Sequence, residues 1–326
     1  MAWRLRLAPE KTNINFFAHQ WLTFGGSMAL MVAAFVLWGL LGLNFGIDFK
    51  GGTTLRTDST TVVDVGRYRQ TLAALNLGDI AINEVFDPSF RADQHVASIR
   101  ISAVDGVDSI SPQTLNEVKA ALVRMDRNLT IPSIESVGPK VSGELVKSSI
   151  IAVAVTSFAI MAYIWLRFEW QFALGGVLAL LHDVFITIGI FALFQIKFDL
   201  TIVAALLTIL GYSINDTVVV FDRLRENLIK YKIMPLREVM NLSVNETLSR
   251  TLMTSLTTLI AVGSMLVLGG DVIRGFSFAI FIGVFLGTYS SVYVAKNLVL
   301  FLGLDRSDKV RKTGKGADHE FANIDA

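Results

Sequence analysis

Long apolar runs separated by polar segments dominate the chain, and six of them have the length of a membrane-spanning helix. A helix needs about 20 apolar residues to cross a bilayer. The first run starts too late and is too long for an ordinary cleaved signal, so we expect it to be retained. The six runs, each predicting one transmembrane helix, are residues 21–43, 148–166, 172–195, 200–221, 251–269 and 275–295.

The segment between the first two runs, residues 44–147, has a soluble composition and alternates between strand and helix patterns. Its second helix is expected to begin with Ser111 as N-cap and Pro112 in the first turn. The order of elements, βαββαβ, predicts a ferredoxin-like α+β domain. The strands are expected at 51–57, 80–86, 95–101 and 130–137, and the helices at 62–75 and 111–127.

The basic residues of the loops predict the orientation of the chain in the membrane. They are concentrated in the two chain ends and in residues 222–250, whereas the alternate short connections carry only Lys197 and Arg274. Because short basic loops stay in the cytoplasm, both termini are predicted to be cytoplasmic. The predicted division is a cytoplasmic tail (1–20), a first transmembrane helix (21–43), a periplasmic α+β domain (44–147), a five-helix transmembrane bundle (148–302) with a cytoplasmic loop at 222–250, and a cytoplasmic tail (303–326).

Two further patterns predict contacts between helices. Within residues 222–250, the stretch LREVMNLSVNETL has helical apolar spacing, and it predicts a helix that lies either at the membrane interface or under the bundle. The sixth run carries a small residue at every fourth position, which predicts close helix packing inside this chain or against a partner. These small residues are Gly275, Ala279, Gly283, Gly287 and Ser291.

Composition narrows the class of protein. Hydrophobic residues make up 52% of the chain and charged residues 17%, which is typical of a membrane protein, and the net charge of +1 provides no field that attracts nucleic acid. The chain has no cysteine, which excludes disulfides and thiolate metal sites. The stretch GIDFKGGT lacks P-loop spacing, and HExxH and GxSxG motifs are absent. We therefore expect no enzyme activity, no catalytic residue, no cofactor and no metal.

Two carboxylates interrupt the apolar runs. Asp183 follows His182 near the middle of the third run, and Asp216 lies in the fourth run, six residues (about 9 Å) from its cytoplasmic end. A carboxylate facing lipid costs at least about 2.5 kcal/mol, and such groups almost always face the bundle interior or water. We therefore expect both side chains to point into the bundle.

Hydroxyl residues share the helix faces on which these charges lie. Helical spacing places Ser213 and Thr217 on the face of Asp216, and a second polar stripe opens the fifth run, with Arg250 at its cytoplasmic edge. Burial favours the neutral form of a carboxyl group and a nearby cation favours the ionised form, so Asp216 and Arg250 suit a proton path, with Asp183 as a third member. The second stripe, which we expect to face the first across a polar seam, consists of Thr251, Thr254, Ser255 and Thr258.

Each charged residue also has a structural interpretation. Asp216 can form a static ion pair or hydrogen bond, and Arg250 can extend to the membrane interface. Asp183 and His182 can be a satisfied pair in helix packing. On sequence grounds both interpretations stay open.

Four motifs resemble those of the bacterial protein-export membrane proteins of the SecD/SecF family. They are NFGIDFKGGT after the first run, VGPKVSGEL (137–145), GYSINDTVVVFDRLREN (211–227) and RTLMTSLTTL at the start of the fifth run. The resemblance covers nearly the whole chain. It implies one half of a twelve-helix bundle of the RND type, which means six transmembrane helices with one extracytoplasmic ferredoxin-like domain between helices 1 and 2.

The resemblance also implies partners and a role. Family members of this kind pair with SecD in the bacterial inner membrane, associate with the SecYEG channel and YajC, and use the proton-motive force to promote late steps of preprotein translocation. It places Asp216 and Arg250 on the proton path and leaves open whether the ion is H⁺ or Na⁺. Two other functions are weighed against this one: an RND-type exporter of small molecules or lipids, and a scaffold of the translocon that transports nothing.

Overall fold

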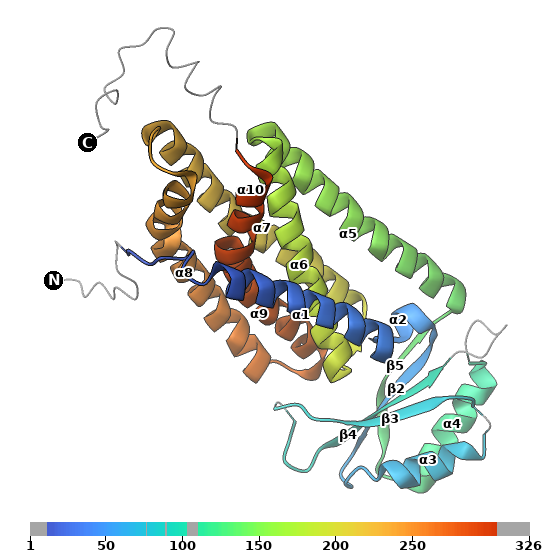
Figure 1. The fold of residues 1–326 in the computed structure, drawn as a ribbon. Coiled ribbons are helices and arrows are strands. Elements are labelled where there is room, and N and C mark those ends of the chain that lie inside the picture. Colours follow the sequence, from blue (N-terminus) through green and yellow to red (C-terminus); the bar gives the residue numbers. More distant parts are fainter. Residues whose placement is uncertain (1–11, 76, 89, 103–109, 305–326) are drawn as a thin grey trace.

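The computed structural model describes residues 12–75, 77–88, 90–102 and 110–304. Figure 1 shows a bundle of long helices with a small α+β domain at one end. Six helical spans in the described part of the chain are long and apolar enough to cross a membrane. They are α1 (Gln20–Leu41), α5 (Pro139–Arg167), α6 (Trp170–Phe194), α7 (Leu200–Lys230), α8 (Leu236–Leu268), and a composite span of α9 (Asp271–Ser290), the π-helical turn η1 (Ser291–Ala295) and α10 (Lys296–Leu302).

The α+β domain has the ferredoxin-like fold that the sequence predicts. Its four antiparallel strands lie in the order β3-β4-β2-β5, and both helices cover one face of the sheet (Figure 1). Leu55, Ile99 and Leu122 are fully buried in the core between the two layers. The elements are β2 (Gly52–Ser59), α3 (Val65–Ala73), β3 (Ile80–Val85), β4 (His95–Ser102), α4 (Pro112–Met125) and β5 (Thr130–Val137).

Short elements connect this domain to the bundle. Strand β1 (Asn44–Phe45) pairs in parallel with β6 (Lys197–Phe198), directly before α7. Helix α2 (Ile47–Lys50) follows β1, and the Asp48 carboxylate accepts a hydrogen bond from the first backbone N–H of α7, that of Leu200, at 3.0 Å. The chain therefore leaves and re-enters the bundle through a small, hydrogen-bonded junction.

The expected cytoplasmic loop at 222–250 is a helical hairpin instead. Helix α7 continues to Lys230 and α8 begins at Leu236, so only five residues connect them. Polar side chains hold the two extensions together, because Asn227 donates to Ser243 (3.0 Å) and to Glu246 (2.6 Å), which also pairs with Arg223 (2.7 Å). Of the two interpretations of this helix, the structure supports packing under the bundle.

The small-residue face of the sixth span packs inside this chain. A Cβ atom on Gly283 would lie 2.3 Å from the side chain of Ile209, and one on Gly287 would lie 2.9 Å from Ser213. The predicted close packing is confirmed, and the partner is α7. This approach places polar residues of α7 and α9 around the same side chains of the neighbouring helices α6 and α8.

Candidate functional site

Asp183 is fully buried in α6 and is hydrogen-bonded to two other helices. One carboxylate oxygen, Oδ2, accepts from Ser213 of α7 (2.8 Å) and from Ser290 of α9 (2.7 Å). The other, Oδ1, lies 3.0 Å from Nδ1 of His182. Three hydrogen-bonding partners reduce the cost of burying this group, because a buried carboxyl without partners is strongly unfavourable.

Asp216 lies in α7, one turn beyond Ser213, and its side chain is also buried. Its Oδ2 atom accepts from Ser255 of α8 at 3.4 Å, and Ser255 in turn accepts from Thr288 of α9 at 2.6 Å. The two polar stripes therefore face each other at Ser255. This second group joins α7, α8 and α9.

The two carboxylates belong to one polar region because the same two helices contribute to both groups. Helix α7 supplies Ser213 to Asp183 and carries Asp216 itself. Helix α9 supplies Ser290 to Asp183 and Thr288 to the group around Asp216. A hydroxyl group both donates and accepts, so this chain of side chains can rearrange around a carboxyl that gains or loses a proton.

The remaining seam residues differ in burial. Thr217 is buried and donates to the Ser213 carbonyl at 3.2 Å. Thr254 and Thr258 are half-buried and donate to carbonyl groups of their own helix. Thr251 is buried, and its hydroxyl has no hydrogen-bond partner within the described residues. Thr254 also interacts with the Asp216 carboxylate, so Thr254 and Ser255 are the members of the predicted stripe on α8 that face it.

Arg250 and Asp216 interact through their charges but not as a direct ion pair. The Arg250 side chain is exposed, and within the described ranges no ion pair joins the two residues. Arg250 lies one helical turn before Thr254, and its charge still acts on the Asp216 carboxylate. The guanidinium group therefore acts on Asp216 through its charge and not through a direct ion pair.

Sequence reasoning missed three polar residues of the sixth span. Thr288 and Ser290 lie in GTYSSVY, and this group of hydroxyl residues was the available signal. Lys296 was missed because the expected span ended one residue before it. Its side chain is buried, its Nζ atom lies 4.0 Å from the ring centroid of Phe17, and it donates to the Phe16 carbonyl at 3.1 Å. Lys296 therefore fixes the segment before α1 against the bundle.

The fold and the buried network define a multi-pass membrane protein, in which six helices carry a ferredoxin-like domain after the first and enclose two carboxylates. The protein-family model for the C-terminal region of the protein export membrane protein SecD/SecF matches residues 117–305 of the sequence. The family model for the SecD/SecF GG motif matches residues 36–59. The chain belongs to the SecD/SecF family of protein export membrane proteins.

Similar proteins have been named from other bacteria. The protein translocase subunit SecF of Cereibacter sphaeroides is 67% identical over 326 residues, which is the full length of both chains. The protein translocase subunit SecF of Rhodobacter capsulatus is 64% identical, over 99% of this chain and 98% of the relative.

Solved structures agree with the fold. The crystal structure of SecDF, a translocon-associated membrane protein from Thermus thermophilus, matches 91% of this chain with a TM-score of 0.81 and 34% identity. SecDF in its "Super-membrane-facing form" matches 94% with a TM-score of 0.66 and 35% identity. This chain spans only 39% and 40% of those two SecDF chains.

Proposed function

We propose that this chain is the SecF-type subunit of the bacterial protein translocase, and that it uses the proton-motive force, together with SecD, to promote late steps of preprotein translocation. Relatives that match the full chain are named protein translocase subunit SecF, and the solved relative is described as translocon-associated. The proposed partners are SecD, the SecYEG channel, YajC and the translocating preprotein. The proposed location is the inner membrane.

The observation that carries the proton step is the pair of buried carboxylates with hydroxyl partners on neighbouring helices. Asp183 and Asp216 are 0% and 3% exposed, and each contacts side chains of at least one other helix. When such a carboxyl group gains or loses a proton, the hydrogen bonds that its hydroxyl neighbours donate or accept must change. One charge that crosses 100 mV releases about 2.3 kcal/mol, so a few protons suffice for a modest domain movement.

The helices are buried to different extents, which supports the presence of a partner that supplies the other half of the bundle. Half or more of the most apolar windows of α6, α7 and the α9–α10 span is buried within the chain, against 11% for α1, α5 and α8. Lipid and SecD would together cover these exposed faces. We assign to SecD the larger part of SecDF that this chain does not match. A polar group of SecD is then the expected neighbour of the exposed Arg250, so the chain alone is not expected to transport.

The proposed orientation places the ferredoxin-like domain in the periplasm and both termini in the cytoplasm. The basic residues of the chain ends and of the α7–α8 hairpin support this arrangement, since all three lie on one side of a six-span chain. The domain would then act where precursors emerge.

The experiment is precursor release from vesicles that contain this chain, SecD and SecYEG, measured with and without a proton gradient. Asp216→Asn keeps the size of the side chain and cannot take up a proton, whereas Asp216→Glu keeps the carboxyl group. We expect Asn to abolish only the gradient-dependent part of release and Glu to retain some of it. A sodium gradient in place of the proton gradient tests the alternative ion.

Asp216→Asn must be compared at equal assembly with SecD, so that loss of the complex is not read as loss of coupling. If the Asn variant releases precursor as the unsubstituted chain does, the proton role of Asp216 is wrong, and a scaffold function becomes the better explanation.

A further inference from the structure

The ferredoxin-like domain is attached to the bundle at two separate places. At the first, its two chain connections lie together: Gly51 has a φ of +72°, and a Cβ atom there would lie 3.3 Å from the backbone of Pro139. At the second, β2 and the segment after β3 reach the first turn of α9. The first attachment is narrow, as in a hinge, and Arg100 of β4 adds a hydrogen bond to the Phe45 carbonyl of β1 at 2.8 Å. The second attachment is the one that reaches α9.

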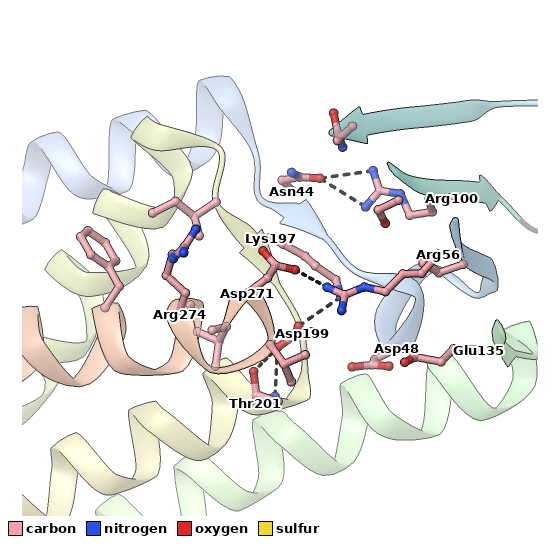
Figure 2. A pocket seen from close by; sticks show the side chains of 18 of the residues that line it. Asn44, Asp48, Arg56, Arg100, Glu135, Lys197, Asp199, Thr201, Asp271 and Arg274 are labelled. Carbon is pink, nitrogen blue, oxygen red and sulfur yellow. Dashed lines mark hydrogen bonds and ion pairs between the residues drawn. The ribbon is translucent and has the colours of Figure 1, made fainter. Parts of the chain in front are cut away.

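Two groups of the domain bind the N-terminus of α9. The Asp87 carboxylate accepts a hydrogen bond from the Asp271 backbone N–H at 2.7 Å. A carboxylate is favourable there because the first N–H groups of a helix have no partner within the helix and the helix dipole is positive. In addition, Arg56 of β2 forms an ion pair with the Asp271 side chain (Figure 2). Arg274 of α9 adds a third contact, because its guanidinium group donates to the Phe86 carbonyl at 2.9 Å.

A cleft lined by both charged and apolar side chains surrounds this contact. It has a volume of about 660 Å³ and lies between the open face of the sheet and the outer ends of the bundle helices (Figure 2). The sheet lines it with Thr54, Arg56, Ser98 and Arg100, whereas the apolar face of the sheet is covered by α3 and α4. The bundle side of the cleft also carries apolar side chains, among them Ile202, Val272 and Phe278.

The other end of α9 reaches the carboxylate network. The helix has 20 residues, which corresponds to about 30 Å. Its last turn supplies Thr288 to Ser255 and Ser290 to Asp183. The π-helical turn η1 follows directly after Ser290, and such turns are often found at functional sites.

The two solved relatives superpose on this chain to different extents. The two SecDF structures match nearly the same share of this chain at 34% and 35% identity, but with TM-scores of 0.81 and 0.66. The parts that they share with this chain are thus arranged differently in the two structures.

We propose that Arg56, Asp87 and the first turn of α9 form the joint that passes the charge state of the buried network to the ferredoxin-like domain. This proposal rests on the proton use proposed above. When Asp183 changes its charge, Ser290 changes its hydrogen bonding and α9 shifts. Because α9 is a stiff rod, the shift moves Asp271 relative to Arg56, and the domain turns about the connections at Gly51 and Pro139.

The chain contains no cysteine, so one introduced cysteine can report on the cleft. Ser98→Cys places it in the cleft wall, on the strand position paired with Arg56. The measurement is its rate of labelling by a membrane-impermeant maleimide added on the domain side, in vesicles with SecD and SecYEG, with and without a proton gradient. Arg56→Gln is the test variant, Arg56→Lys the conservative one, and Arg69→Gln on the exposed side of α3 the matched control.

We expect a gradient to change the labelling rate in the reporter chain and in Arg69→Gln. Arg56→Gln should raise the rate about two- to fivefold and remove its response to the gradient, and Arg56→Lys should restore part of that response. If Arg56→Gln behaves as Arg69→Gln does, the joint is wrong. If Arg56→Gln raises the rate but no chain responds to the gradient, the contact between Arg56 and Asp271 exists but the proposed proton use is wrong. The proposal that this contact passes the charge state of the network to the domain is then also wrong.

Discussion

Asp183 shows how much a single buried group depends on its neighbours, since three side chains from three helices contact it. Removing one donor from a buried carboxyl leaves part of its hydrogen-bonding capacity unused. We expect Ser290→Ala to destabilise the folded chain by about 1 kcal/mol, measured by thermal unfolding in detergent. Ser264→Ala is the control, because Ser264 is exposed and donates only to its own helix. Equal stability of the two variants would contradict the structural importance of this contact.

Residue types alone identified some members of this network. Ser213 and Asp216 were found because they share a face of one helix, which helical spacing fixes. Ser290 was not found, because which face of α9 meets Asp183 depends on how α6, α7 and α9 pack. Arg250 was predicted to pair with Asp216 from its position in the chain; its side chain is exposed, and it acts on Asp216 through its charge without a direct ion pair.

A second residue-scale prediction concerns the ferredoxin-like domain. Hydrogen bonds from the Ser59 hydroxyl, the Thr61 hydroxyl and the Asn128 backbone hold the pKa of Asp126 below its ordinary value. Because the folded-state pKa is lowered, the stabilisation is present above the unfolded-state pKa of about 4 and is lost as the pH falls through the folded-state value. Asp126→Asn should therefore destabilise the domain near neutral pH.

The stability difference between Asp126→Asn and the unsubstituted chain should shrink as the pH falls below about 4. Unfolding of the full chain in detergent, followed from about pH 3 to pH 7, measures it. Glu117→Gln, on the exposed side of α4, is the charge-matched control. A difference that is constant with pH would show that the carboxylate charge of Asp126 does not stabilise the domain.

At the scale of elements, α9 depends on its small residues. Gly283→Ala would place a Cβ atom 2.3 Å from Ile209, whereas the same change at Gly263 meets only an ordinary contact with Phe281 at 3.5 Å. Alanine normally stabilises a helix more than glycine does, so the sign of the change in stability distinguishes the two sites. We expect Gly283→Ala to destabilise the chain by about 1–3 kcal/mol and Gly263→Ala to be neutral or stabilising, in thermal unfolding. Stabilisation by both would contradict the close packing of α7 and α9.

Periodic elements could be predicted because their pattern is local. The six spans, the order of strands and helices in the domain and the cap at Ser111 all follow from spacing within short windows. The hairpin at 222–250 could not be predicted in full. Its polar surface indicated a loop, whereas contacts such as Asn227 to Ser243 join residues from two helices and continue both beyond the apolar runs.

For the whole molecule, α6, α7 and α9 form the inside of the bundle and α1, α5 and α8 its outside. The carboxylate network lies where the inner helices meet, and α9 connects it to the end of the bundle that carries the ferredoxin-like domain. Under the function proposed above, this arrangement would give the chain both a site for protons and a domain to be moved. A bundle half that lacks its partner would hold the site without a complete path.

Our proposal requires Asp216 to carry protons through the assembled bundle. The most direct measurement is proton entry into liposomes that contain this chain with SecD, followed with a pH-sensitive dye trapped inside under an imposed membrane potential. The account predicts potential-dependent entry for the unsubstituted pair, none above background for Asp216→Asn, and partial entry for Asp216→Glu. Entry at the full rate in the Asp216→Asn pair, with normal assembly, would contradict it.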